Sequence, residues 1–236
     1  METAKRFAKA ILPQSLISRI RRWPYRSGNP STVFSHVYSN SVWGKSDTFD
    51  SGTGSRVPGQ YLDYVEHVTE FLASLPAKPD VVDLGCGDFN IGKQIRPYAA
   101  RYVACDVVPD LIARNREMYR DLDVEFRVTD ITSQDVPDGD IVIVRQVMQH
   151  LSNGLVARVL DQLGKYQYAI ITEHVPDGEF EPNADILTGP YTRMTVGSGL
   201  DLLAPPFSLQ AIDIRELTRV NADEGGIITT TVYRMS

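Results

Sequence analysis

The sequence predicts an α/β protein with a doubly wound sheet of seven strands, an antiparallel final hairpin and an N-terminal helical extension. Short apolar runs alternate with helical stretches from residue 80 onward. A glycine-rich turn follows the first run, and a short link joins the last two runs. Alternating strands and helices form parallel sheets that are covered on both faces, and a short link favours a hairpin.

The predicted elements follow in chain order. Apolar runs give the parallel strands Val81–Leu84, Tyr102–Cys105, Val124–Val128, Asp140–Val144 and Tyr168–Thr172. Apolar residues spaced by three and four predict the helices Gln60–Leu75, Ile91–Tyr98, Pro109–Arg120 and Leu155–Lys165. Residues 174–206 are rich in prolines and turn residues, which predicts an irregular cap. The final hairpin is expected over Ser208–Leu217 and Ile227–Arg234.

Composition narrows the class of protein. A chain of 236 residues with 42% apolar residues can bury a substantial core. No apolar run approaches the roughly 18 to 20 residues that cross a bilayer, so we expect a soluble protein. Two cysteines are too few for a disulfide framework or a zinc cage, which favours a cytoplasmic protein without a metal site. The net charge of −6 argues against nucleic acid as a partner.

The N-terminal leader has the opposite charge. Residues 1–30 hold seven Lys or Arg residues and one acid, with apolar residues at helical spacing. This pattern predicts a basic helical pair that packs on the body or on a second copy in a homodimer. The alternative is a weak contact with an anionic membrane surface.

Acidic residues lie in or just after the first three predicted strands. Asp83 lies in the first strand, just before a glycine turn whose backbone can approach a ligand closely. Asp106 follows Gly87 by 19 residues, close to the spacing that holds ribose hydroxyls, although it can also cap the next helix. Asp130 ends the third strand, where it can accept from an exocyclic amine while Ile131 packs on a purine ring. By itself, Asp130 is equally consistent with a surface turn.

Two common nucleotide chemistries are excluded by missing motifs. The chain has no G-x-x-x-x-G-K-[ST] sequence and no Tyr-x-x-x-Lys sequence. Three carboxylates repel a pyrophosphate, whereas a sulfonium cation with an α-amino group suits an acidic pocket lined by aromatic residues.

The motif Asp83-Leu84-Gly85-Cys86-Gly87, with Asp106, Asp130 and Arg145–Leu151, resembles the class I S-adenosylmethionine-dependent methyltransferases over about residues 58–236. The resemblance implies a Rossmann-like fold, S-adenosyl-L-methionine as cofactor and S-adenosyl-L-homocysteine as product. The cofactor-binding residues that it implies are Asp83, Gly85, Cys86, Gly87, Asp88, Asp106, Val107, Asp130, Ile131 and Arg145. Phe89 stands where the family often has glycine, so Asp88-Phe89-Asn90 are expected to present side chains near the cofactor, with Asp88 accepting from the α-amino group.

A narrower resemblance is to bacterial methyltransferases that tailor glycans or small molecules. It is carried by Val42-Trp43-Gly44, the Ser51–Arg56 loop, Gly87-Asp88-Phe89-Asn90, His150-Leu151-Ser152 and Pro205-Pro206-Phe207. We therefore divide the chain into a leader and cofactor-lid segment, residues 1–56, and a methyltransferase domain, residues 57–236. For the Ser51–Arg56 loop, the alternative to a lid is a plain linker.

Residues beyond the cofactor motifs are candidates for the reaction. His150 follows the fourth strand and is the predicted general base, because an imidazole accepts a proton near neutral pH. The alternative is that His150 only starts a helix. Arg145 is expected to steady an anionic acceptor or to pair with an acid of the pocket. Tyr38, Trp43, His174 and Arg193 are the predicted substrate contacts.

The predicted function is methyl transfer to a small molecule or glycan, most readily to oxygen. The alternative is a non-catalytic domain that binds S-adenosylmethionine and regulates. Nucleic-acid modification is disfavoured, since no [D/N/S]-P-P-[Y/F/W] motif follows the fourth strand.

Overall fold

The computed structural model describes residues 25, 28–44, 49–223 and 225–235. The predicted helical leader, with its alternative membrane and homodimer contacts, therefore lies almost entirely outside the described residues. None of the helices in the described part is long and apolar enough to cross a membrane.

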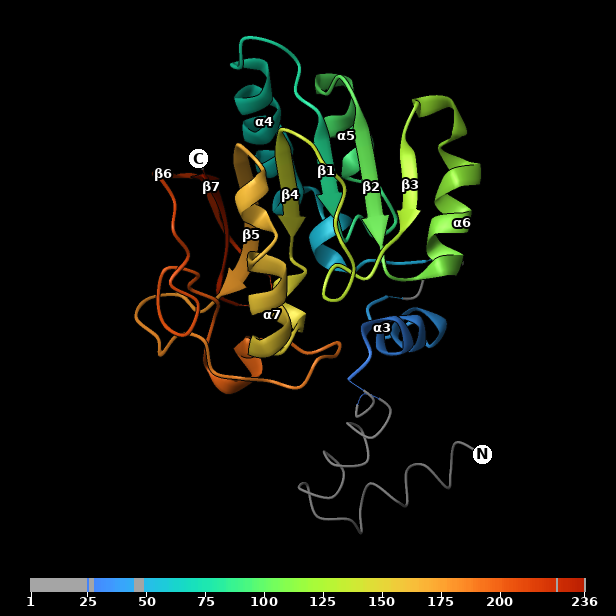
Figure 1. The fold of residues 1–236 in the computed structure, drawn as a ribbon. Helices are drawn as coiled ribbons and strands as arrows, with labels where there is room; N and C mark the ends of the chain where they lie inside the picture. Colours follow the sequence, from blue (N-terminus) through green and yellow to red (C-terminus); the bar gives the residue numbers. More distant parts are fainter. Residues whose placement is uncertain (1–24, 26–27, 45–48, 224, 236) are drawn as a thin grey trace, which may run out of the picture.

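One seven-stranded sheet forms the centre of the fold (Figure 1). Its strands stand in the order β3-β2-β1-β4-β5-β7-β6. They are β1 (Val81–Leu84), β2 (Tyr102–Asp106), β3 (Glu125–Val128), β4 (Ile141–Arg145), β5 (Tyr168–Val175), β6 (Asp213–Asn221) and β7 (Ile227–Arg234). The first five are parallel, and β7 runs antiparallel to both β5 and β6. The predicted fold class is confirmed.

Helices cover both faces of the sheet (Figure 1). The α-helices are α3 (Pro30–Ser39), α4 (Pro58–Ala73), α5 (Gly92–Ile95), α6 (Pro109–Met118) and α7 (Asn153–Leu160). Short 3-10 turns are η2 (Thr53–Ser55), η3 (Arg96–Tyr98), η4 (Arg120–Leu122), η5 (Met148–His150), η6 (Leu163–Lys165) and η7 (Arg193–Val196). Buried residues of α4 and α5 join the core on one face, and those of α3 and α7 join the core on the other.

Several predicted elements end or begin at other residues, and two of these differences have a local cause. The helix expected over Ile91–Tyr98 stops at Ile95, because Pro97 has no N–H to continue the helical ladder, and a 3-10 turn follows. The strand expected from Ser208 starts at Asp213 instead. Ser208 has a φ of 51° and donates its N–H to the Ala204 carbonyl, so its backbone belongs to the cap.

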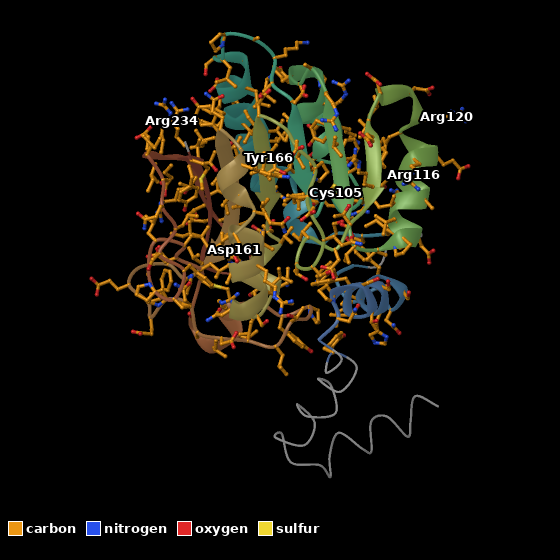
Figure 2. The ribbon with its side chains drawn as sticks, in the orientation of Figure 1. Cys105, Arg116, Arg120, Asp161, Tyr166 and Arg234 are labelled. Carbon is orange, nitrogen blue, oxygen red and sulfur yellow. The ribbon has the colours of Figure 1, made fainter. Side chains whose placement is uncertain are left out.

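The core shows why α3 belongs to the body. Val33, Phe34 and Val37 of α3 lie in the same apolar cluster as residues of β1, β4 and β5. Figure 2 places Cys105 in the middle of the sheet, where its thiol is buried and free. Residues of α3 thus pack into the core on one face of the sheet.

Candidate active site

A cavity of about 380 Å³ opens at the carboxyl ends of the parallel strands. The strand order reverses between β1 and β4, and ligands of doubly wound sheets bind in the crevice at this point. The cavity brings together nearly all of the predicted site residues: Tyr38, Trp43, Asp83, Gly85, Cys86, Gly87, Asp88, Asp106, Val107, Asp130, Ile131, Arg145, His150 and His174.

Asp83 and Asp106 are the buried acids of the cavity. Tyr102 donates its hydroxyl to Asp83 at 3.0 Å, yet burial raises the pKa of Asp83 from 3.8 to about 7. Asp106 accepts the backbone N–H groups of Gly87 and Val108, each at 3.1 Å. Burial raises the pKa of Asp106 to about 6 despite these bonds. A cationic or hydroxyl-bearing ligand in the cavity would therefore stabilise the ionised form of both carboxyls.

The glycine turn needs its glycines for two reasons. Gly85 and Gly87 have φ values of 82° and 54°, in the left-handed region that favours glycine. A Cβ on Gly87 would lie 2.5 Å from Ser51 Oγ, and one on Gly85 would collide with Val147. Asp106 therefore binds a turn that only glycine can form.

Phe89 does not face the cavity, so the prediction that it presents its side chain near the cofactor is wrong. Its ring is fully buried and packs edge to face against Tyr102, Tyr119 and Phe126, with centroids 4.9 to 5.6 Å apart. A φ of 60° at Phe89 turns the backbone so that the ring enters the core. Asp88, the preceding residue, does line the cavity.

Asp130 and Ile131, the residues expected at the adenine, both line the cavity just beyond β3. Asp130 Oδ1 accepts the N–H and the hydroxyl of Thr132 at 3.0 and 2.6 Å. These bonds leave Oδ2 without a partner among the described residues, and Ile131 lies beside it on the cavity wall.

The segment before α4 contacts the glycine turn directly. Ser51 Oγ accepts the Asp88 N–H at 2.9 Å and is 3.0 Å from the Tyr38 hydroxyl. Arg56 forms ion pairs with Asp50 at 2.9 Å and with Asp88 at 3.3 Å. These contacts favour a segment that covers the cavity over a plain linker.

Trypsin should therefore cleave after Arg56 more slowly when S-adenosylhomocysteine is present, because a ligand under the segment adds contacts that hold it down. Cleavage after Arg120, whose side chain is exposed on η4, is the internal reference. Ser51→Ala should weaken the protection by removing the bond to Asp88. Equal cleavage rates with and without ligand would support the linker.

Arg145 reaches across from β4 to this segment. It donates to the Gly54 carbonyl and, at 3.4 Å, to Ser55 Oγ, and its guanidinium lies 4.9 Å from the Tyr64 ring centroid. Burial lowers the pKa of Arg145. Arg145 Nε and the Tyr64 hydroxyl are buried without a hydrogen-bond partner and line the cavity. Two unpaired donors beside Asp83 fit a zwitterionic amino-acid group.

Aromatic rings of α3 and the loop after it form another wall of the cavity. Trp43 lies 5.0 Å from the His150 ring, 5.4 Å from Tyr38 and 5.8 Å from Phe34. Its indole N–H donates to the Pro190 carbonyl at 3.2 Å, which joins the N-terminal segment to the cap. This wall suits a flat or apolar acceptor.

His150 was predicted to be a general base with a pKa near neutral, but its ring is buried. Burial lowers the pKa of His150 from 6.5 to about 4, so the ring is neutral but a weak base at pH 7. His150 lies between aromatic rings of α3 and the following loop.

Arg193 is not a substrate contact, and that prediction is wrong. Its side chain is 1% exposed and lies outside the cavity lining. The guanidinium donates to the carbonyls of Met148, Gln149 and Leu151 and to Asn153 Oδ1. Through these hydrogen bonds, Arg193 connects the cap to the loop that carries His150.

Sequence reasoning missed Ser51, Tyr64 and Gln149 as cavity residues. Ser51 was part of a glycine- and serine-rich loop, and its side chain could have been singled out only by its contact with the glycine turn. Tyr64 sits among apolar residues of a helix, where its spacing predicts core packing. Gln149 has no distinguishing neighbour in the sequence.

The strand order is the one that the resemblance to class I methyltransferases implies. Residues 81–166 match the family model described as a methyltransferase domain. This match and the sheet confirm the resemblance found in the sequence. No curated protein matches the chain significantly in sequence.

Solved structures share the fold at low identity. The N-methyltransferase NodS from Bradyrhizobium japonicum, in complex with S-adenosylhomocysteine, has a TM-score of 0.63 and 13% identity, covering 84% of this chain and 97% of its own. The 1,6-didemethyltoxoflavin-N1-methyltransferase of Burkholderia thailandensis, with bound 1,6-didemethyltoxoflavin and S-adenosylhomocysteine, has a TM-score of 0.56 and 16% identity over 86% of each chain. TehB from Haemophilus influenzae has a TM-score of 0.51 and 13% identity, covering 76% and 65%.

Proposed function

We propose that this protein transfers the methyl group of S-adenosylmethionine to a hydroxyl of a small molecule or glycan. One observation carries the proposal: Asp83 of β1, Asp106 of β2 and Asp130, just beyond the adjacent strand β3, line one cavity that also includes the glycine turn. Asp83 faces the ammonium group, Asp106 the ribose hydroxyls and Asp130 the adenine amine. Arg145 Nε and the Tyr64 hydroxyl donate to the carboxylate.

The bound cofactor supplies an electrophilic methyl group on a sulfonium. The chain's own part is to hold the acceptor in line and to exclude water, which supplies most of the rate in such a displacement. The aromatic wall and the cap do this on the β4 and β5 side of the cavity.

Oxygen is favoured over nitrogen by the charges on the acceptor side. The lining residues contributed by α3, η5 and the cap carry no carboxylate in the described part of the chain, so a protonated amine finds no counter-ion there. Two of the similar structures are N-methyltransferases by name, and amines therefore belong in the test.

The test has two stages. Calorimetric titration should show binding of S-adenosylmethionine. Release of S-adenosylhomocysteine is then measured with phenols, sugars, carboxylates and amines as acceptors. Binding with no release from any acceptor would favour the regulatory alternative, and absence of binding would contradict both.

A further inference from the structure

We propose that His174, and not His150, takes the proton of the acceptor; this rests on the methyl transfer proposed above. Both imidazoles line the same cavity. Hydrogen bonds around each ring fix which nitrogen carries the proton and which keeps a lone pair.

The proton of His150 is fixed through Gln149. The backbone N–H of His174 donates to Gln149 Oε1 at 2.9 Å, which sets the orientation of the amide. The amide nitrogen then lies 3.3 Å from His150 Nε2. An amide nitrogen only donates, so Nε2 is the acceptor and the proton of His150 sits on Nδ1. Nδ1 is buried without a hydrogen-bond partner, and the ring has no lone pair left for an acceptor proton.

His174 has the opposite tautomer. Its Nε2 lies 2.6 Å from the carbonyl oxygen of Gly225, in the turn between β6 and β7. A carbonyl only accepts, so Nε2 carries the proton and Nδ1 keeps the lone pair. None of the described residues makes a hydrogen bond to Nδ1. The ring is only partly buried, so it can exchange a proton with water.

The hairpin turn holds the His174 ring in place. Gly225 and Gly226 have φ values of 87° and 78°. A Cβ on Gly226 would lie 2.6 Å from the Met194 methyl group and 3.1 Å from His174 Nε2. Only glycine, which has no Cβ, lets the turn pack this closely against the ring. The Gly225 carbonyl then fixes the tautomer of His174, as backbone carbonyls do for many histidines.

Methyl transfer to a hydroxyl is coupled to the loss of one proton. The acceptor oxygen forms a bond to the methyl carbon while the carbon–sulfur bond breaks and its electron pair goes to sulfur. The hydroxyl proton passes to His174 Nδ1, giving an imidazolium that the Gly225 carbonyl stabilises through Nε2–H. The imidazolium then releases that proton to water.

Carbethoxylation tests the assignment without an acceptor. Diethyl pyrocarbonate modifies imidazole nitrogens that have an accessible lone pair. We expect His174 to react about tenfold or more faster than His150 in the intact protein, with the exposed His67 as reference. Nitrogen-15 NMR should show Nε2–H for His174 and Nδ1–H for His150. Faster modification of His150, or the reverse tautomers, would overturn the proposal.

Turnover gives the second measurement. With phenol, or the panel hydroxyl compound that is methylated fastest, His174→Gln should lower kcat by roughly 10²- to 10⁴-fold, the usual loss of a general base. His67→Gln, on the exposed face of α4, should leave it unchanged. Both variants should bind S-adenosylmethionine normally. Normal binding with undiminished turnover in His174→Gln would refute only the base assignment, whereas wild-type protein that does not bind would refute the proposed function.

Discussion

Replacing Asp83 with Asn is expected to stabilise the ligand-free fold at pH 8 and to remove most of the affinity for S-adenosylmethionine. The folded state holds the Asp83 proton more tightly than the unfolded chain, because burial raises its pKa from 3.8 to about 7. Stability therefore falls as the pH rises from about 4 to about 7, and the loss is complete above pH 7. Three pKa units correspond to at most about 4 kcal/mol.

Asn has the shape of Asp and can still accept the Tyr102 hydroxyl, so the variant should fold. The free energy of unfolding, measured by urea titration, should exceed that of wild type at pH 8 and match it near pH 4. Calorimetry gives the affinity. The control is Asp63→Asn, on the exposed side of α4, which should change neither quantity. A variant that binds as wild type would show that Asp83 does not face the cation.

Asp106→Ala should weaken S-adenosylmethionine binding by roughly 10- to 150-fold, which corresponds to 1.5–3 kcal/mol for a charge-assisted hydrogen bond. Two effects combine. The ribose loses its acceptor, and the Gly87 and Val108 N–H groups lose the carboxylate that positions the glycine turn. Affinity for wild type should also rise between about pH 5 and pH 7, because ionised Asp106 and Asp83 favour the cationic ligand.

Asp110→Ala is the matched control, since Asp110 is exposed in the first turn of α6 and lies outside the cavity lining. Thermal melting should show that both variants are folded. Unchanged affinity in folded Asp106→Ala would leave Asp106 as a cap of α6 alone.

The sheet was predictable because its signal is local. Buried parallel strands are continuous apolar runs, and β1 has the predicted bounds. The residues at which strands end depend on pairing with other strands, which the sequence does not show. The fifth strand continues past the predicted Thr172 to Val175 because β7 pairs with it along its whole length.

Within the site, residue types were easier to predict than environments. Acids at strand ends were recognised because topology brings strand ends together. The pKa of His150 is lowered by burial, and two of the rings that bury it, Phe34 of α3 and Trp43 of the following loop, are more than a hundred residues away in the chain. Arg193 was assigned to the substrate because a buried arginine bound to carbonyls cannot be told from an exposed one by sequence.

The position of Ser51 on the glycine turn implies a compulsory order of addition in the kinetics. The Ser51–Arg56 loop that covers Gly87 also contacts the acceptor wall, because Ser51 Oγ lies 3.0 Å from the Tyr38 hydroxyl. With the lid role that we propose for this loop, S-adenosylmethionine enters while the loop is lifted, and the contact between Ser51 and Tyr38 forms again after the loop returns. Initial-rate patterns should therefore show S-adenosylmethionine binding first and S-adenosylhomocysteine leaving last, with S-adenosylhomocysteine competitive against the cofactor alone.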